Sequence, residues 1–212
     1  MQIEKAKIIY VMDPQCGWCY GNSENITYLK ETFESEFDFQ LYTGGMWIGQ
    51  NAPRGGAGFS NFLETHAPRM VATTGAKVEV AYFDRARDPQ YAFSSLEPSA
   101  AIVAIKHLAP DRVFDFSKAV QRALFVEGKR LDQVETYLPI VEKLAIDANS
   151  FKSVWMTSQN IQEASDEFDQ AHTLATGFPT LLMESQGTLK VLASGYFDRN
   201  AMKKKLEGLL VK

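Results

Sequence analysis

The sequence predicts a mixed α/β fold in which a small sheet domain is interrupted by a large all-helical insertion. Three observations lead to this prediction: a strand, helix and strand open the chain, a long block with helical periodicity follows, and the tail returns to two strands and a helix. We therefore expect a discontinuous sheet domain made of residues 1–50 and 174–212, with residues 51–173 as an inserted helical domain.

The opening elements are read from their apolar patterns. Residues 5–12 form a short apolar run with β-branched and aromatic side chains that stops at Asp13, as expected of a buried strand. Residues 20–37 carry large apolar side chains at spacings of three and four, which predicts an amphipathic helix: Ile26, Leu29, Phe33 and Phe37. Residues 38–45 alternate and end at paired glycines, which predicts a strand and a turn.

The middle of the chain is predicted to be helical after an irregular loop. Residues 46–58 are rich in glycine and proline, which disfavours regular structure. Helical periodicity then recurs in segments separated by Pro, Gly or Asp: 57–66, 97–110, 111–128, 130–146 and 160–175. Ser158 or Asn160 is the predicted N-cap of the last segment.

The tail completes the sheet domain. Residues 178–185 and 188–195 are predicted strands joined by a turn at residues 186–187. The final predicted helix covers residues 198–212, with Asp198 as its N-cap. A hairpin and a helix would complete the sheet begun by the first strand, helix and strand.

Composition excludes several classes of protein. A hydrophobic content of 45% excludes a fully disordered chain. The net charge of −4 gives no basic stripe for phosphates, so we expect no nucleic-acid partner. No run approaches the roughly 20 apolar residues that cross a bilayer, and the N-terminus has no secretory signal pattern. We therefore expect no membrane association and a cytoplasmic location, while the oligomeric state is not predicted.

Cys16 and Cys19 are the only two cysteines, too few for the disulfide framework of a secreted protein. They lie between the first predicted strand and the first predicted helix. At a helix start their Cα atoms would be roughly 5 Å apart, within the range of a disulfide. Such a short ring restricts the unfolded chain very little, so the bond suits redox cycling better than structural support.

The helix N-terminus should also make the two thiols unequal. Unpaired backbone N–H groups and the helix dipole there would lower the pKa of Cys16 from ~8.5 toward ~3.5–7.5. Cys19, one turn inside the helix, should be more buried, keep a higher pKa and act as the resolving thiol.

Two other interpretations of the cysteines stay open. They could be inert buried thiols, or half of a zinc site. Zinc needs four ligands, and three histidines are isolated within predicted helical segments: His66, His107 and His172. We therefore expect no metal site and favour redox use.

The order of strand, C-G-W-C, helix, strand, helical insertion, TGFPT, hairpin and helix resembles the DsbA-like branch of the thioredoxin superfamily. The segments DPQCGWCYG, RALFVEGKRL and ATGFPTLLM are similar to a bacterial group in that branch described as predicted protein-disulfide isomerases. The resemblance covers nearly the whole chain. It implies a thioredoxin-like fold with a large all-helical insertion, and thiol–disulfide oxidoreductase activity.

The resemblance also implies roles for the residues of the motif. Cys16 would be the attacking cysteine and Cys19 the resolving one. Gly17 and Trp18 would be the variable dipeptide that tunes the redox potential. Direction of electron flow does not follow from these residues, because the potentials of such motifs span about −270 to −120 mV.

Pro179 would match the cis-proline that faces the disulfide in the family. A proline offers no N–H, and the neighbouring backbone of Phe178 could pair with an extended substrate segment. Trp47, with Met46 and Ile48, could line an apolar rim near Cys16, or could instead be buried between the two domains.

One position departs from the family pattern. Relatives often carry a buried acid six residues before the first cysteine, where this chain has Tyr10. Asp13 is nearer to the motif, although it also suits a turn before Pro14. The proton route during resolution is therefore open between water, Tyr10 and Asp13.

The expected function is thiol–disulfide exchange with protein or small-molecule substrates. The redox centre is the cysteine pair itself, with no bound cofactor and with glutathione as a candidate co-substrate. Two alternatives are a glutathione-dependent isomerase or transferase of the same fold, and a non-catalytic module that binds a peptide or a metal.

Overall fold

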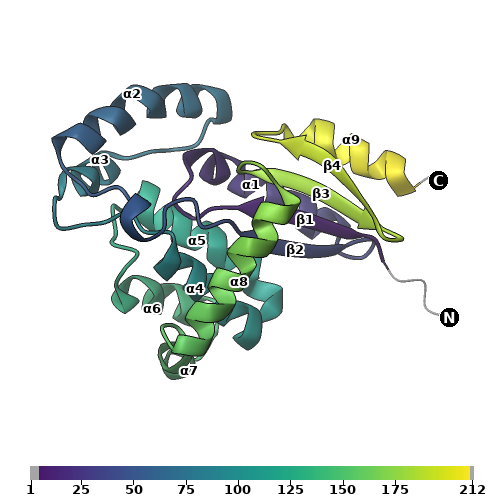
Figure 1. Ribbon diagram of the computed structural model, residues 1–212. Coiled ribbons are helices and arrows are strands. Elements are labelled where there is room, and N and C mark those ends of the chain that lie inside the picture. The colour runs from purple at the N-terminus through teal and green to yellow at the C-terminus, as the bar shows by residue number, and fades with distance from the viewer. Residues whose placement is uncertain (1–4, 211–212) are drawn as a thin grey trace.

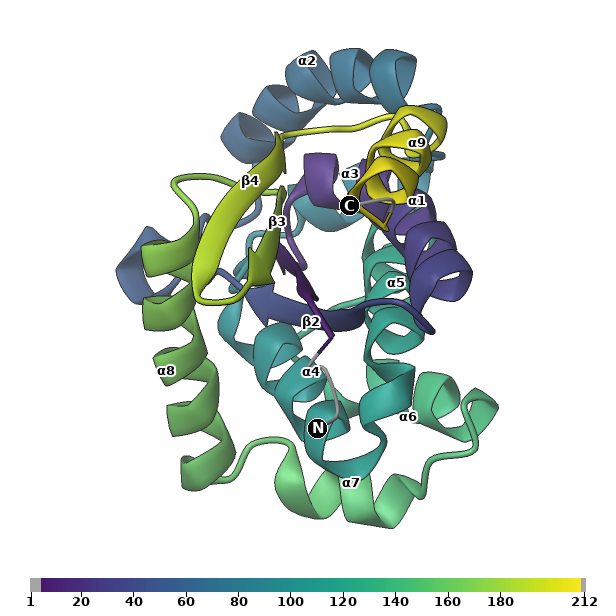
Figure 2. The ribbon, with the colours of Figure 1, turned by 90° about the vertical axis from the view of Figure 1, so that its right-hand side faces the viewer.

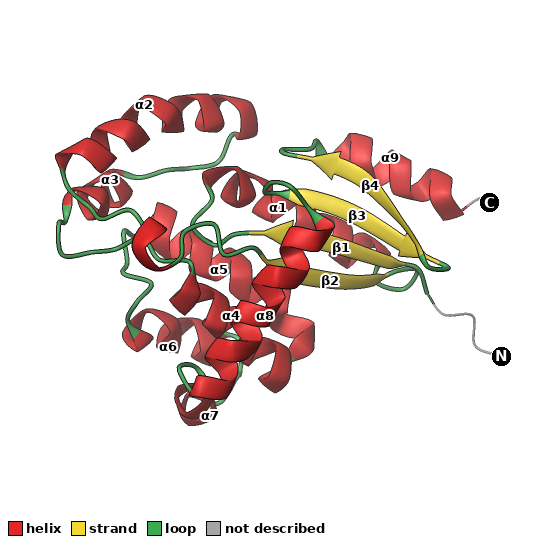
Figure 3. Cartoon of the chain, in the orientation of Figure 1, coloured by secondary structure: helices red, strands yellow, loops and turns green. Residues whose placement is uncertain are grey.

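The computed structural model describes residues 5–210, and its four strands form a single sheet (Figure 3). The strand order is β2-β1-β3-β4, with β1 and β2 parallel and the other neighbours antiparallel. The strands are β1 (Lys7–Met12), β2 (Asp38–Thr43), β3 (Thr180–Ser185) and β4 (Thr188–Ser194). The predicted opening unit and closing hairpin are therefore confirmed.

Helices cover both faces of this sheet (Figure 2). Side chains of β1 point alternately to the two faces. Ile8, Tyr10 and Met12 join the core that includes α1 (Gly17–Phe33) and α9 (Arg199–Leu210). Ile9 and Val11 pack on the other face against α8 (Ser158–Leu174). The end of β1 is thus held on both sides.

Seven helices lie between β2 and β3 within the described residues. They are α2 (Ala57–Thr74), α3 (Val80–Arg87), α4 (Leu96–Leu108), α5 (Val113–Phe125), α6 (Val134–Lys143), α7 (Ala148–Val154) and α8. Short 3₁₀ turns occur at Gly49–Asn51 and Pro110–Arg112. The fold class, thioredoxin-like with a large helical insertion, is confirmed. The exact division at residues 50 and 173 stays a prediction.

Helix boundaries differ from the sequence prediction in several places. α2 continues past Pro68 to Thr74, because a proline removes only one helical hydrogen bond and the freed carbonyl lies on an exposed surface. α1 ends at Phe33, so the buried Phe37 lies in the turn that follows. The N-cap of α8 is Thr157, whose hydroxyl accepts from the Asn160 N–H, rather than Ser158 or Asn160.

Two short helices, α3 and α7, were not predicted. α3 has eight residues, several of them charged, and buries only Tyr82 and Ala86. Its position depends on packing against α2 and α5, which the local pattern does not encode. At the C-terminus, Asp198 caps α9 as predicted, with its carboxylate 2.8 Å from the Ala201 N.

α2 packs beside α1 (Figure 1). It lies at the end of the molecule opposite to residues 5 and 210, the first and last residues that the structure describes. It therefore lies near the start of α1, where the cysteines are. Among residues 5–210, no helix combines the length and apolar character needed to cross a membrane.

Candidate active site

Cys16 is the N-cap residue of α1, and a short turn, residues 13–15, joins it to the end of β1. Its N–H donates to the Asp13 carbonyl at 3.1 Å, and its carbonyl accepts from the Tyr20 N–H at 3.0 Å. The turn and the helix start therefore fix its backbone. Cys16 is 7% exposed and Cys19 is fully buried, and both thiols are free. Cys16 is thus largely enclosed by its neighbours, with only a small part of its surface exposed.

The two thiols have opposite pKa shifts. The pKa of Cys16 is lowered, first by a hydrogen bond from the Cys19 thiol and then by the backbone N–H groups of Cys19 and Trp18, while burial and Asp13 oppose the shift. The pKa of Cys19 is raised well above its ordinary value by burial and by the nearby Cys16. The site therefore favours a thiolate at Cys16 and a protonated Cys19.

The loop before β3 faces Cys16. The peptide bond between Phe178 and Pro179 is cis, as the family resemblance implied. The Cys16 Sγ lies 3.8 Å from the Phe178 carbonyl oxygen. Pro179 is buried, and its carbonyl accepts from the Gly195 N–H at 2.8 Å, which ties this loop to the end of β4. The Phe178 carbonyl is thereby held beside the Cys16 sulfur.

Asp13 is more than a turn residue. It is fully buried, and its carboxylate accepts from the Gln15 N–H at 2.8 Å, the Met46 N–H at 2.7 Å and the Ser95 hydroxyl at 3.0 Å. Its own N–H donates to the Cys19 Sγ at 3.4 Å. Burial raises the pKa of Asp13, and these three donors oppose the shift. Asp13 thus joins the motif, the loop after β2 and the helical insertion.

Tyr10 lies beneath the motif. Its hydroxyl donates to the Cys19 carbonyl oxygen at 3.4 Å, and burial raises its pKa well above the ordinary value. Tyr10 therefore contacts the backbone of Cys19, whereas Asp13 contacts the Cys19 sulfur through its N–H.

A cavity of about 290 Å³ opens beside Cys16. It includes the predicted residues Gly17, Trp18, Met46 and Trp47, while Ile48 is not among its lining residues. Trp47 is half-buried and also packs edge-on against Phe59 at 5.6 Å between ring centroids. Trp47 therefore both lines the cavity and packs against the helical insertion.

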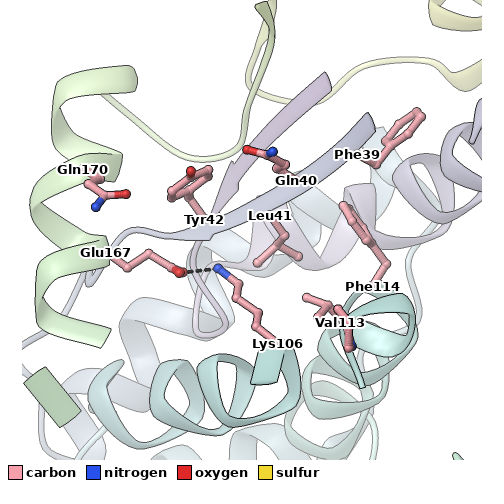
Figure 4. Close-up of a pocket in the computed structure, with 10 residues that line it drawn as sticks. Phe39, Gln40, Leu41, Tyr42, Lys106, Val113, Phe114, Glu167 and Gln170 are labelled. Atoms are coloured by element: carbon pink, nitrogen blue, oxygen red, sulfur yellow. Dashed lines mark hydrogen bonds and ion pairs between the residues drawn. The ribbon is translucent and has the colours of Figure 1, made fainter. Parts of the chain in front are cut away.

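Glu167 and Lys106, whose ion pair is drawn in Figure 4, form a second set of polar contacts near the end of β2. Glu167 on α8 accepts from the Thr43 N–H at 2.7 Å and the Thr43 hydroxyl at 2.8 Å, and it forms an ion pair with Lys106 on α4. The Lys106 Nζ lies 5.1 Å from the centroid of the Tyr42 ring. β2 is thus anchored just before the loop that carries Met46.

Several residues of the site have no signal in the sequence. The helical insertion contributes Ser95, which donates to Asp13, and it contributes three cavity residues, Phe62, Met70 and Tyr82. Gln15 also lines the cavity beside Cys16. Their positions depend on how the insertion packs, which spacing does not encode.

The three histidines lie at separate places. His66 is at the mouth of the cavity, with its ring centroid 4.4 Å from that of Phe62. His107 pairs with Glu163. The ring centroid of His172 lies 6.2 Å from that of Phe178. Within residues 5–210, no three His, Cys, Asp or Glu side chains are grouped so that they could hold a metal ion.

A dithiol at a helix start, facing a cis-proline loop at the edge of a hairpin, defines a thioredoxin-like protein. No family model and no curated protein matches the chain. Solved structures do match. A "putative protein disulfide isomerase" from Nitrosomonas europaea has a TM-score of 0.84 at 22% identity, covering 98% of both chains. That identity shows the fold alone.

Cytosolic disulfide reductase DsbM from Pseudomonas aeruginosa has a TM-score of 0.81 at 28% identity, covering 96% of this chain and 98% of its own. The same reductase with GSH matches over 97% of this chain at 28% identity and a TM-score of 0.81. The chain is a DsbA-like protein of the thioredoxin superfamily, and its structural neighbours are thiol–disulfide oxidoreductases.

Proposed function

We propose that this protein is a thiol–disulfide oxidoreductase that works through a mixed disulfide at Cys16. The observation that carries the proposal is the sulfur of Cys16, with its lowered pKa, 3.8 Å from the Phe178 carbonyl oxygen and next to a protonated Cys19. A nucleophilic thiolate, a resolving thiol and a backbone acceptor for substrate are together what this exchange requires.

The reaction balances as a two-electron transfer. The Cys16 thiolate attacks one sulfur of a substrate disulfide, and the other sulfur leaves as a thiolate. Cys19 then loses its proton and attacks the Cys16 sulfur, which releases the second substrate thiolate and leaves a Cys16–Cys19 disulfide. In isomerisation, a thiol of the substrate would attack the mixed disulfide in place of Cys19.

Asp13 is the proposed destination of the Cys19 proton. It is fully buried, contacts the Cys19 Sγ through its N–H, and has a raised pKa that suits a group which takes up a proton. The Tyr10 hydroxyl already donates to the Cys19 carbonyl, so it is less suited to this role.

Glutathione is the proposed reductant that returns the disulfide to the dithiol, and the cytoplasm is the proposed location. The description of DsbM as a cytosolic disulfide reductase supports the proposed location. Its structure with GSH supports glutathione as the reductant. Two glutathione thiols would supply the two electrons and leave as glutathione disulfide.

Thiol exchange by the wild type, Cys16→Ser and Cys19→Ser tests the proposal. We expect no turnover with Cys16→Ser, and a trapped mixed disulfide, visible by mass spectrometry, with Cys19→Ser. Equal turnover by the wild type and Cys16→Ser would reject the function. A titration of the cysteine pair in glutathione buffers would then set the direction of electron flow. Tight glutathione binding without redox turnover would favour a glutathione-dependent isomerase or transferase.

A further inference from the structure

The cavity beside Cys16 is formed by the motif and by the helical insertion together. The motif supplies Cys16, Gly17 and Trp18, and the loop after β2 supplies Met46 and Trp47. α2, α3 and α5 supply the opposite wall: Phe62, Leu63, His66, Ala67, Met70, Tyr82 and Phe125. The reacting sulfur is therefore part of the cavity wall.

Apart from Cys16, Gln15 and His66, the residues that line the cavity are apolar or glycine, with Tyr82 contributing a mainly aromatic surface. The described residues around the cavity include no aspartate, glutamate, lysine or arginine. His66 is exposed at the mouth, beside the ring of Phe62. Phe62 itself is 50% exposed, so half of its surface is open to contact with a bound group. An uncharged apolar group would gain by covering it, whereas a charged group would lose its hydration without finding a partner.

The volume limits the size of the occupant. At about 290 Å³ the cavity lies at the lower end of pockets that enclose whole small-molecule ligands. It therefore suits one side chain better than a complete tripeptide. Glutathione also carries two carboxylates and an ammonium group, and the cavity lining includes no lysine, arginine, aspartate or glutamate side chain to pair with them.

Cys16 borders both the cavity and the Phe178 carbonyl oxygen. A substrate segment that lies along Phe178 and Pro179 with its own sulfur at Cys16 can therefore place an adjacent side chain in the cavity. We propose that the cavity selects substrate peptides in which the reacting cysteine is next to a large, uncharged apolar side chain. This inference rests on the proposed exchange function and names its substrate class.

Single-turnover reduction of matched disulfide peptides tests the selection. The pre-reduced protein is the two-electron donor, and each peptide carries Phe, Ser or Glu beside its cysteine, on either side. Rates are divided by those with dithiothreitol, which removes differences in intrinsic reactivity. We expect the Phe peptide to react at least ~10-fold faster than the Ser peptide, because it buries a large apolar side chain. The Glu peptide and glutathione disulfide should react no faster than the Ser peptide.

Phe62→Ser is the informative variant, because Phe62 is half exposed and its loss should not prevent folding. We expect its Phe-to-Ser rate ratio to fall roughly threefold or more. Leu189→Ser is the matched control, since Leu189 is 44% exposed on β4, outside the cavity lining. It should leave both rates unchanged.

The outcomes separate the two proposals. Equal normalised rates for the Phe and Ser peptides, or an unchanged ratio in Phe62→Ser, would overturn the selection and leave the exchange function standing. Failure to reduce any disulfide would overturn the exchange function itself.

Discussion

The ring of Phe178 lies directly against the backbone of Gly44. A Cβ added to Gly44 would come within 2.0 Å of the ring, a distance at which one of the two must move. The carbonyl of the same Phe178 lies 3.8 Å from the Cys16 Sγ. The absence of a side chain at the end of β2 therefore helps to set the position of the carbonyl beside the reactive sulfur.

Gly44→Ala should consequently slow the exchange reaction and destabilise the protein. The added methyl group would displace Phe178 and its carbonyl, and overpacking of this kind typically costs about 1–3 kcal/mol. Single-turnover reduction of a disulfide peptide and urea unfolding measure the two effects.

Gly58→Ala is the matched control, because a Cβ there meets no atom within 4 Å and the residue lies inside α2. That change should stabilise the helix slightly, by ~0.5–1 kcal/mol, and leave the rate unaffected. A wild-type rate in Gly44→Ala would show that the position of Phe178 does not depend on Gly44.

Cys19→Ala should raise the pKa of Cys16. The Cys19 thiol makes the largest contribution to lowering that pKa, so its removal destabilises the thiolate. The rate of alkylation by iodoacetamide should therefore rise with pH at a higher midpoint in Cys19→Ala than in the wild type.

Cys19→Ser is the companion variant, because its hydroxyl can still donate to the Cys16 sulfur. Its midpoint should lie between those of the wild type and Cys19→Ala. Identical midpoints in all three proteins would mean that backbone N–H groups alone set the pKa of Cys16.

The parts of the site that could be predicted are those encoded by neighbouring residues. A strand that ends before Asp13, a helix start at the cysteine motif and a proline before a strand are all visible as local patterns. The opposite directions of the two pKa shifts could also be predicted, although the largest contribution at Cys16 comes from the Cys19 thiol and not from the backbone N–H groups.

The parts that could not be predicted depend on distant packing. Asp13 suits a turn by its type and its neighbours, yet its carboxylate also binds the Met46 N–H and the Ser95 hydroxyl. Those partners come from the loop after β2 and from the insertion. The wall of the cavity likewise depends on where α2 and α3 pack, which local periodicity leaves undetermined.

Asp13→Asn should lower both the stability of the protein and the pKa of Cys16. An asparagine amide keeps one oxygen, so its NH₂ group would oppose a backbone N–H of Gln15 or Met46, at a cost of ~1–3 kcal/mol. The charge of Asp13 raises the pKa of Cys16, so its loss shifts the alkylation midpoint to lower pH. Urea unfolding and the pH dependence of alkylation test the two parts separately.

Resolution should also slow in Asp13→Asn, since the proposed acceptor of the Cys19 proton is removed. The decay of the mixed disulfide, followed by rapid quenching and mass spectrometry, measures this step. An unchanged decay at every pH would exclude Asp13 from the proton route.

Glu167→Ala should destabilise the protein much more than Glu163→Ala, although both residues lie on α8, four residues apart. The Glu167 side chain is 10% exposed, accepts hydrogen bonds from Thr43 and pairs with Lys106. Its removal leaves the Thr43 N–H, the Thr43 hydroxyl and the Lys106 ammonium group without their acceptor. Since Lys106 keeps some contact with water, we expect a loss of about 2–4 kcal/mol.

Glu163 pairs with the exposed His107 and should contribute under ~1 kcal/mol, so the same substitution there controls for the change in helix propensity. Urea unfolding gives both values. Because Glu167 anchors β2 just before Gly44, Glu167→Ala should also slow peptide reduction, and Glu163→Ala should not. Equal losses of stability in the two variants would mean that the anchoring of Thr43 adds nothing beyond an ordinary surface pair.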